Sequence, residues 1–546
     1  MVGMVCRPAC PVPAPDTRRR IAYDEVPRLS NAIMTSTTAG WGRKERLVIL
    51  GFLCAVGLAL RVALTLGSPN QPYPDETFLL DQAHRIVWGY GITPIDWRIG
   101  MRSWYLPGLI APVFWVGDRV LPLRNPCLLA AALFFGLISL APVICGFLWA
   151  ERLGGKVAAI LTAGLAAVWL DLVYFGPRAL HEVLAGHLLI FGLYLAFPGV
   201  PVLSRARMVA AGGLWGFACI DRIQLAPVFA VLGVYCLFKH RSLRWGGLLA
   251  GFAAALCAYG AIDWLTLGHP WQSVYTYYNS QVTRGVATSF GAAPWYYFIG
   301  KMVSFWGAAF LPLVGLAWMG ARRMPLLGIL AVTVLLAHSL VPHKEYRFVY
   351  PCLVLLVLLA GIGFSEILNR LRVPAHGALA CVLCFAITSA VLAAQPAFRS
   401  LLAKNQGEIL SFGQIGADAG ACGVILWQDY WWQTPGYTGL HRDIPIYQAG
   451  SDIRLRRYQP GANYIVAASR LDSPGEFTLV RTFTRGEPVY LYHRPGGCTR
   501  EYLSERVLNP IPGADPNPLG PELLHYDSSF AHLGLERSIQ SLTLGR

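Results

Sequence analysis

Residues 47–66 read LVILGFLCAVGLALRVALTL, and a few residues later the chain reads Tyr73-Pro74-Asp75-Glu76. The first stretch holds a single charge, Arg61, and is long enough to cross a hydrocarbon core of roughly 30 Å as a helix. Two adjacent carboxylates directly after such a run lie near a membrane–water boundary. Ionisable groups there carry a free-energy cost and often serve chemistry. This stretch therefore predicts a membrane fold and marks a candidate active site.

The composition of the whole chain is that of an integral membrane protein. Of its 546 residues, 55% are hydrophobic and 14% are charged, and the mean hydropathy is +0.46. Soluble domains carry about 25% charged residues. Further apolar runs that are long enough, or nearly so, to span a membrane lie at residues 157–175, 245–265 and 346–364. The predicted fold class is an all-α polytopic membrane protein.

The net charge of +15 has two explanations, nucleic-acid binding or the excess of cations in cytoplasmic loops. The basic residues occur in ones, twos and threes between apolar runs, without a basic arm or recognition helix. Alternate short loops are basic and nearly free of acidic residues, so we assign them to the cytoplasm and predict no nucleic-acid partner. These loops contain Arg43, Lys44 and Arg46; Arg152 and Lys156; Arg205 and Arg207; Lys239, Arg241 and Arg244; Arg322 and Arg323; and Arg370 and Arg372.

The apolar runs predict about eleven transmembrane helices. With a cytoplasmic N-terminus and an odd number of crossings, the tail from about residue 396 lies outside the cytoplasm. Residues 104–123 are apolar but interrupted by Pro107, Asp118 and Arg119, so we expect an interfacial or re-entrant helix there. The approximate spans are 45–66, 126–150, 156–175, 179–197, 207–221, 223–239, 245–265, 296–319, 324–341, 346–366 and 377–395.

The front of the chain divides into two segments. Residues 1–44 lack the apolar core of a secretory signal peptide and are predicted to be a disordered cytoplasmic leader. Met1 and Met34 are both candidate starts. Residues 45–395 form the predicted transmembrane domain, whose 67–124 loop is extracytoplasmic and catalytic.

Residues 396–546 are predicted to form a small extracytoplasmic α/β or β-rich domain, with a poorly ordered Pro-rich end at 510–521. The chain has 13 cysteines, none with metal-ligand spacing in a polar context, and no metal or cofactor is predicted. Cys422 and Cys498 lie in the polar tail. If the tail is extracytoplasmic they could form a disulfide, but the sequence does not establish the pairing. Short β-like runs lie at 424–427, 464–467, 477–481 and 489–492.

The loop after the first span contains its own helix. Asp81, His84, Arg85 and Trp88 recur at i, i+3, i+4 and i+7, which places them on one face. We expect such a helix to lie along the membrane surface. Gly89 then ends the helix.

Asp75 has two interpretations. An Asp before a helix is a preferred N-cap, because its carboxylate accepts a backbone N–H bond. Glu76 is adjacent and Arg102 follows on the same loop. In that setting a carboxylate can accept the proton of a sugar hydroxyl, which is a general-base role. The two roles do not exclude each other.

A cationic cluster, His343-Lys344-Glu345-Tyr346-Arg347, lies between two late apolar runs. On the first turn of a helix, His343 and Arg347 would share a face with Lys344 beside them. Their alternative role is to snorkel at a helix end, which the predicted non-cytoplasmic side disfavours. Arg and Lys commonly bind phosphate, a helix N-terminus adds to this preference, and Glu345 could orient the cations. The cluster therefore predicts a phosphate site.

Smaller ionisable clusters lie on the same predicted side. Arg178, His181 and Glu182 begin the fourth span, and Asp221 and Arg222 lie between the fifth and sixth. Ionisable residues at a membrane boundary are candidate site residues. Pairing among these groups to close the bundle is the alternative.

These residues carry a resemblance to a known family. Tyr73-Pro74-Asp75-Glu76-Thr77, Gly89-Tyr90-Gly91 and residues 102–108 (RSWYLPG) resemble the first-loop motif of the GT-C mannosyltransferases of glycosyltransferase family 22. Residues 343–348 (HKEYRF), followed by Tyr350-Pro351, resemble its second motif, usually His-Lys-Glu-x-Arg-Phe. The family elongates N-glycan precursors and GPI anchors from dolichol-phosphate-mannose and has bacterial relatives.

The tail adds a weaker part of the same resemblance. Gly436-Tyr437 with residues 441–445 (HRDIP) is similar to the family's tail. The resemblance thus covers nearly the whole chain in order, and the part beyond residue 400 is its least certain portion.

The resemblance implies a GT-C fold, a polyprenyl-phosphate-mannose donor and an inverting transfer with Asp75 as the base. It also implies that His343, Lys344 and Arg347 bind the donor phosphate. Tyr73 stands where many members have His, so the identity of the acceptor is not implied. The other candidate substrate-binding residues are Glu76, Arg102, Arg178, Glu182, Arg222 and Glu345.

The sequence therefore predicts a membrane mannosyltransferase that acts on a glycan or glycolipid acceptor. A transporter or flippase of lipid-linked sugars is one alternative, and the same enzyme with another lipid-phosphate sugar is a second. We expect a bacterial inner membrane with a periplasmic active site, or a lumenal site in the endoplasmic reticulum if the host is eukaryotic. The sequence does not determine the oligomeric state.

Overall fold

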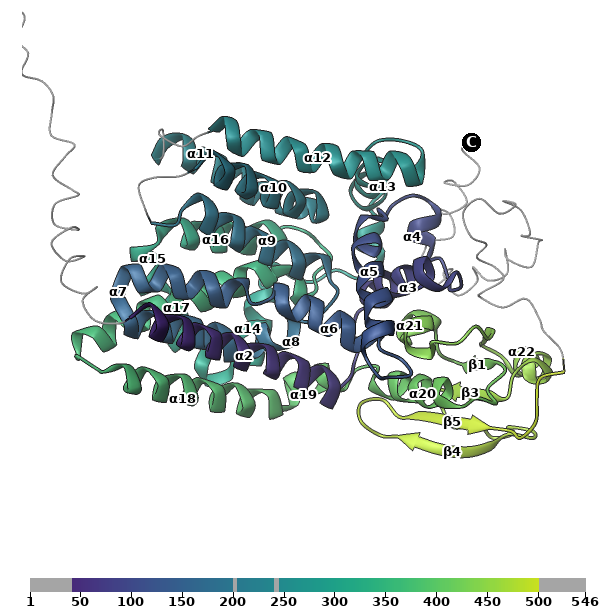
Figure 1. Cartoon of the computed structure of the whole chain (residues 1–546). Helices are drawn as coiled ribbons and strands as arrows, with labels where there is room; N and C mark the ends of the chain where they lie inside the picture. The colour runs from purple at the N-terminus through teal and green to yellow at the C-terminus, as the bar shows by residue number, and fades with distance from the viewer. Residues whose placement is uncertain (1–41, 200–203, 240–244, 500–546) are drawn as a thin grey trace, which may run out of the picture.

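The computed structural model of the protein describes residues 42–199, 204–239 and 245–499. A bundle of helices forms one end of the molecule and a small sheet the other, with the helices of the first loop between them (Figure 1). Most of the predicted leader, the candidate start Met34 and the Pro-rich end at 510–521 lie outside the described residues.

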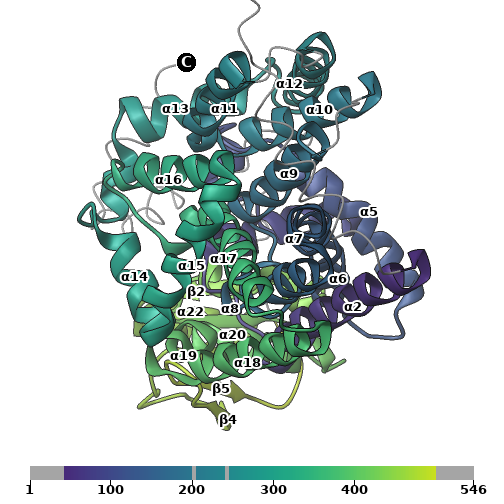
Figure 2. The same ribbon diagram turned by 90° about the vertical axis from the view of Figure 1, so that its left-hand side faces the viewer.

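Each of the eleven apolar runs contains helix. Figure 2 shows the bundle turned by 90°, with α7 and α17 near its centre and α12 and α18 at opposite margins. The helices of the bundle are α2 (Arg43–Gly67), α6 (Cys127–Ile138), α7 (Ala141–Val168), α8 (Leu170–Phe175), α9 (His181–Ala196), α10 (Arg205–Asp221), α11 (Ala226–Lys239), α12 (Trp245–Leu267), α14 (Tyr297–Trp306), α15 (Phe310–Arg323), α16 (Pro325–Ser339), α17 (Tyr350–Arg370) and α18 (Ala375–Ala394).

Six helices among the described residues are long and apolar enough to cross a membrane, or up to seven if a bent pair counts as one span. The count by length is lower than the predicted eleven because some runs are broken or short. The runs 126–150 and 156–175 meet inside α7, where Gly154 and Gly155 have a non-helical backbone. The runs 207–221 and 223–239 form the bent pair, at an angle of 118°. Helices α9 and α16 are apolar but shorter.

Arg61, the one charge in the first run, has a structural explanation. Its side chain is fully buried and donates to the backbone oxygens of Gly57, at 2.8 Å, and of Ala167 and Ala166, at 3.1 and 3.2 Å. The last two belong to the C-terminal end of α7, where helix carbonyls lack partners and the helix dipole is negative. Arg61 therefore joins α2 to α7.

The first loop folds into three helices, α3 (Pro74–Trp88), α4 (Ile95–Arg98) and α5 (Tyr105–Val120). Gly89 ends α3 with φ at 79°, a left-handed conformation that glycine adopts without strain. This confirms the predicted helix and its end. The apolar stretch that we expected to be interfacial or re-entrant forms α5.

The C-terminal part of the chain covers the polar face of α3, and the expectation that this helix lies along the membrane surface stays a prediction. Asp81 and His84 are fully buried. The Asp81 carboxylate accepts hydrogen bonds from the backbone N–H of Tyr437 at 3.1 Å and from the N–H and hydroxyl of Thr438 at 2.8 and 2.7 Å. These donors belong to α21 (Gly436–Leu440). Burial raises the pKa of Asp81 to about 6, against the opposing effect of these hydrogen bonds.

The C-terminal part has a mixed five-stranded sheet in the order β2-β1-β3-β5-β4. The strands β2, β1 and β3 are parallel, and β5 runs antiparallel to β3 and β4. This is the α/β form of the predicted tail domain. Its strands are β1 (Val424–Trp427), β2 (Ile446–Ala449), β3 (Tyr464–Ala467), β4 (Thr478–Phe483) and β5 (Val489–His493), and its other helices are α19 (Pro396–Ala403), α20 (Gln406–Ala417) and α22 (Asp452–Tyr458).

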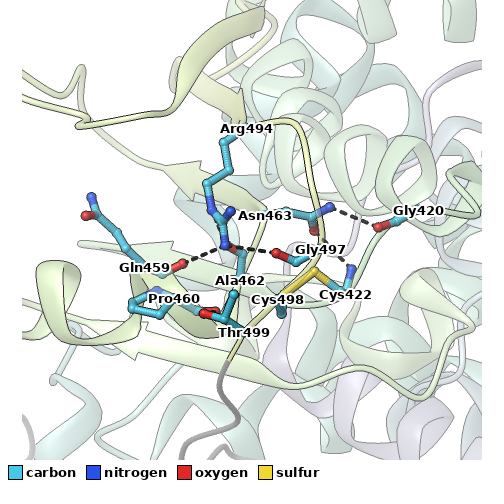
Figure 3. Close-up of a disulfide and its surroundings, with 10 residues drawn as sticks. All are labelled: Gly420, Cys422, Gln459, Pro460, Ala462, Asn463, Arg494, Gly497, Cys498 and Thr499. Carbon is cyan, nitrogen blue, oxygen red and sulfur yellow. Dashed lines mark hydrogen bonds between the residues drawn. A yellow bond between two sulfur atoms is a disulfide. The ribbon is translucent and has the colours of Figure 1, made fainter.

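Cys422 and Cys498 form a disulfide, which resolves the pairing that the sequence left open (Figure 3). The bond ties the segment before β1 to the segment after β5. Beside it, Arg494 Nε donates to the carbonyl of Ala462 at 3.0 Å, and the backbone N–H of Cys422 donates to Asn463 Oδ1 at 3.0 Å. The two ends of the sheet domain are thus fastened at one point.

Replacing both cysteines with serine should lower the thermal stability of this domain. A crosslink that closes a loop of 76 residues stabilises by about 4 kcal/mol in the chain-entropy model. The midpoint of tail unfolding, followed by limited proteolysis against temperature, measures the effect. A double Ser variant at the unpaired Cys381 and Cys384 is the control and should not shift it. An unchanged midpoint in the Cys422/Cys498 variant would contradict the crosslink.

Candidate active site

The first turn of α3 presents Asp75. The helix begins at Pro74 with Tyr73 as its N-cap, so Asp75 is the second helical residue and the N-cap interpretation is wrong. Pro is favoured at the first helical position because its φ is already helical and its missing N–H is not needed there. It starts the helix one residue before the acidic pair.

Two guanidinium groups hold the carboxylate of Asp75. Arg102 Nη2 donates to Oδ1 at 2.8 Å, and Arg347 Nη2 donates to Oδ2. Burial would raise the pKa of Asp75, but Arg347 and Arg102 outweigh it and hold that pKa well below its usual value. The side chain is still 23% exposed. The first-loop motif and the motif at residues 343–348 therefore meet at the carboxylate of Asp75.

Arg347 is the centre of the cluster. Besides Asp75, it contacts Glu345 through Nε at 2.6 Å and Glu182 through Nη1 at 3.4 Å. Its guanidinium also lies 4.6 Å from the centre of the Tyr73 ring. Only 5% of its side chain is exposed. Three carboxylates from three parts of the chain thus converge on one cation.

The prediction that His343 and Arg347 share a helical face is wrong. Glu345 has an extended backbone, with φ at −126° and ψ at 142°, and the short helix η5 starts only at Tyr346. The preceding residues are held by a neighbouring loop, where the N–H of Ala293 donates to the carbonyl of Pro342 at 3.0 Å. His343 and Arg347 meet instead through Glu345, which lies 3.2 Å from His343 Nε2.

Lys344 stands apart from the carboxylates. Its ammonium donates to the carbonyl of Ala293 at 2.8 Å, to that of Pro342 at 3.4 Å, and to that of Val341. The residue is 7% exposed. In this structure Lys344 fastens the 291–293 loop, and its predicted role as a phosphate ligand stays a prediction.

Glu76 points to a second cation. It accepts from Arg178 Nη1 at 2.9 Å, and the same nitrogen donates to the carbonyl of Asn70 at 2.8 Å. Burial raises the pKa of Glu76, although Arg178 acts in the opposite direction. The ring of Tyr174 lies 4.1 Å from the Arg178 guanidinium. This pair braces the first turn of α3.

The two boundary clusters also pair. Arg222 Nη2 lies 3.2 Å from Glu182, and the Arg222 guanidinium lies 4.6 Å from the centre of the Phe348 ring. His181 Nδ1 lies 2.6 Å from Asp221 Oδ1. The pairs join α9 to the end of α10, as the bundle-closing interpretation expects, and Glu182 also contacts Arg347. A role of these residues in a site stays a prediction.

One acidic residue was missed by the sequence analysis. Asp96, in α4, lies 3.3 Å from Arg102 Nε, so Arg102 bridges two carboxylates. Asp96 follows Gly89-Tyr90-Gly91 and precedes Arg102 by six residues in the sequence. Its place in the same polar loop was the available signal.

The contacts form one connected network. Every predicted site residue takes part or flanks it, except Lys344, whose ammonium lies on carbonyls. The network consists of Asp96, Arg102, Asp75, Arg347, Glu345, His343, Glu182 and Arg222, and the flanking pairs are Glu76 with Arg178 and His181 with Asp221. Three guanidinium groups in one network can bind an anion that displaces a carboxylate.

An apolar groove of about 1060 Å³ includes Tyr105, which lies near the flanking residue Asp221. It is lined by α5, α6, α7, α9, α10 and α12, through side chains such as Leu109, Phe134, Leu188 and Phe217. Tyr105 is also part of the lining, and it follows Arg102 by three residues. The size and the apolar walls suit a hydrocarbon chain.

Comparison with known proteins identifies the family. A family model described as the Alg9-like mannosyltransferase family matches residues 52–410. The chain belongs to this family. Its relatives include "GPI mannosyltransferase 3" of Yarrowia lipolytica, 26% identical over 71% of this chain and 75% of the relative. "GPI alpha-1,2-mannosyltransferase 3" of Mus musculus is 24% identical over 60% of this chain and 61% of the relative.

Solved structures confirm the GT-C fold. ArnT from Cupriavidus metallidurans, in a crystal structure bound to undecaprenyl phosphate, has a TM-score of 0.51 and 14% identity, and the match covers 83% of this chain and 98% of ArnT. Its apo structure matches equally well, with a TM-score of 0.51. The chain is therefore a membrane mannosyltransferase of the Alg9-like family with a GT-C fold.

The network predicts a pH dependence of stability. Burial would raise the pKa of Glu345, but Arg347 and His343 outweigh it and lower that pKa to about 2. The unfolded value is about 4.3. The stability from this group is therefore present above about pH 4.3 and is lost as the pH falls toward 2, by an amount on the order of 2 kcal/mol.

Between pH 5 and pH 3 the Glu345→Gln variant should lose less thermal stability than the unsubstituted protein, because it lacks this titration. Thermal midpoints in detergent across that range measure the difference. Asp452→Asn, at an exposed position in α22, is the control and should keep the original slope. Equal slopes in all three proteins would rule out a native ion pair at Glu345.

Proposed function

We propose that the protein transfers mannose from a polyprenyl-phosphate-mannose donor to a hydroxyl of a glycan or glycolipid acceptor, with inversion at the anomeric carbon. The contact between Asp75 and Arg347 is the observation that carries this proposal. It puts a proton acceptor next to a group that binds phosphate, which is what a sugar transfer from a lipid phosphate requires.

The donor phosphate would bind at Arg347. Its guanidinium has a fork geometry that suits phosphate oxygens, and Arg102 and His343 lie one carboxylate away on either side. Binding would displace Asp75 or Glu345 from Arg347. The polyprenyl chain would lie in the apolar groove that begins at Tyr105. Lys344 would first have to leave its carbonyl partners to reach the phosphate.

Asp75 would act as the general base. As the acceptor oxygen forms its bond to the anomeric carbon, the bond from that carbon to the phosphate oxygen breaks, and the electron pair leaves with the phosphate. The hydroxyl proton passes to Asp75, whose partial exposure leaves room for an acceptor. Attack opposite the leaving phosphate gives the inverted product.

We propose a glycolipid acceptor and an extracytoplasmic site. Several relatives are named GPI mannosyltransferases, which favours a lipid-linked glycan over a soluble sugar. The disulfide between Cys422 and Cys498 favours an oxidising compartment for the tail. The tail contacts α3 through Asp81, so the site would face the same compartment.

The test uses purified full-length protein, labelled polyprenyl-phosphate-mannose and a panel of mannose-terminated acceptors, with mass spectrometry of the products. Asp75→Asn should reduce transfer by at least about 10²-fold, the usual contribution of a general base, and keep donor binding within a few-fold. Asp118→Asn, at an exposed position of the same loop, should leave transfer unchanged.

Full activity of Asp75→Asn would show that Asp75 is not the general base. Donor binding without any product, from the unsubstituted protein, would favour a transporter of lipid-linked sugars. Product with a different lipid-phosphate sugar, and none with mannose, would contradict the proposed donor.

A further inference from the structure

His181 and Asp221 form a buried pair that the proposed mechanism does not use. His181 begins α9, and its Nδ1 lies 2.6 Å from Asp221 Oδ1 at the end of α10. The side chain of Asp221 is 0% exposed and that of His181 is 12% exposed. Within the described residues, His181 Nε2 and Asp221 Oδ2 are buried atoms without a hydrogen-bond partner. An imidazole held at one nitrogen therefore keeps its other nitrogen unoccupied.

Glu182 and Arg347 connect this pair to Asp75. Glu182, the next residue after His181, contacts Arg347 Nη1 at 3.4 Å, and Nη2 of the same guanidinium contacts Asp75. The charge of His181 also acts on Asp75 in the direction that lowers its pKa. The unoccupied imidazole nitrogen thus belongs to the surroundings of the proposed base, although no element of the mechanism so far needs it.

Asp75 by itself holds a proton poorly. Each of its oxygens accepts from a guanidinium, one from Arg102 and one from Arg347. Such a carboxylate favours its ionised form, and a general base works best when its proton affinity matches the working pH. A proton that reaches Asp75 therefore needs an onward acceptor, and an imidazole titrates in the range of about pH 5 to 8.

We propose that His181, oriented by Asp221, takes over from Asp75 the proton removed from the acceptor hydroxyl. This inference rests on the proposed function. The hydroxyl O–H bond breaks and the proton reaches His181 Nε2 through Asp75. The electron pair of the O–H bond forms the new bond to the anomeric carbon, and the leaving phosphate keeps the pair of the broken bond. The imidazolium releases the proton to water once the product has left the site.

Several charged and titratable groups lie on His181's own helix and on the neighbouring elements. Asp75 lies on α3, Glu182 on its own helix and Arg347 on η5. Asp221 and Arg222 lie at the end of α10, and Tyr105 of α5 lies close to Asp221. Because only neutral His181 can accept a proton, the transfer rate should fall as the pH drops and this side chain becomes charged.

The test is the pH dependence of the rate with saturating polyprenyl-phosphate-mannose. The unsubstituted protein should lose activity on the acid side between about pH 8 and pH 5. His181→Gln keeps a polar side chain but cannot titrate, so kcat should fall by about 10- to 100-fold. The loss of activity on the acid side, here called the acid limb, should disappear in this variant. KM for the donor should stay within a factor of about two.

Two further variants make the result specific. Asp221→Asn should lower kcat less than His181→Gln and should move the acid limb, because the imidazole keeps its place but loses its negative partner. His376→Gln, exposed on α18, is the control and should keep the original rate and profile. Thermal midpoints show whether each variant is folded. If His181→Gln does not fold, the pH profile of Asp221→Asn tests the inference.

An acid limb that persists in His181→Gln, or one that Asp221→Asn leaves in place, would overturn the inference and leave the pair as a structural link between α9 and α10. A parallel loss of rate at every pH, with the limb unchanged, would do the same. Absence of mannosyl product from the unsubstituted protein would instead contradict the proposed function, so the two failures are distinguishable.

Discussion

The ion pair between Asp75 and Arg347 is the constraint on which the rest of the structure depends. The two residues are 272 positions apart in sequence, and Arg347 is almost fully buried. Removing one partner of a buried pair costs about 3–5 kcal/mol because the other charge stays behind unpaired. The bundle therefore has to bring the start of α3 against η5, and the helices between them hold that position. Asp171 contributes to this arrangement, because its carboxylate accepts a hydrogen bond from the hydroxyl of Tyr346 at 2.8 Å.

Helix α3 couples this site to the sheet domain. Its first turn carries Asp75 and Glu76, which pair with cations of the bundle. Further along, Asp81 is bound by α21 of the C-terminal part. One helix of 15 residues thus contacts both halves of the molecule, and Figure 1 shows it between them. A movement of the tail would therefore be transmitted to Asp75 through one helix, α3.

Much of this was predictable from sequence, because the strongest signals were chemical. The apolar runs predicted the fold class, and nine of the ten candidate site residues, all except Lys344, lie in or beside the network. The network itself was not predictable, since periodicity does not say which elements meet. For the same reason, the sequence analysis did not predict that α21 covers Asp81. Lys344 shows a further limit of sequence analysis. The sequence does not tell whether a cation in a motif donates to backbone carbonyls or binds a ligand.

The central claim is that a carboxylate from the front of the chain and a cation from its back half form one phosphate-binding, proton-accepting site. An experimental density map of the full-length protein with polyprenyl phosphate bound tests it most directly. The account predicts the phosphate within hydrogen-bond distance of Arg347, with Asp75 beside it and the hydrocarbon chain in the groove that includes Tyr105. A phosphate bound elsewhere, with the contact between Asp75 and Arg347 undisturbed, would contradict it.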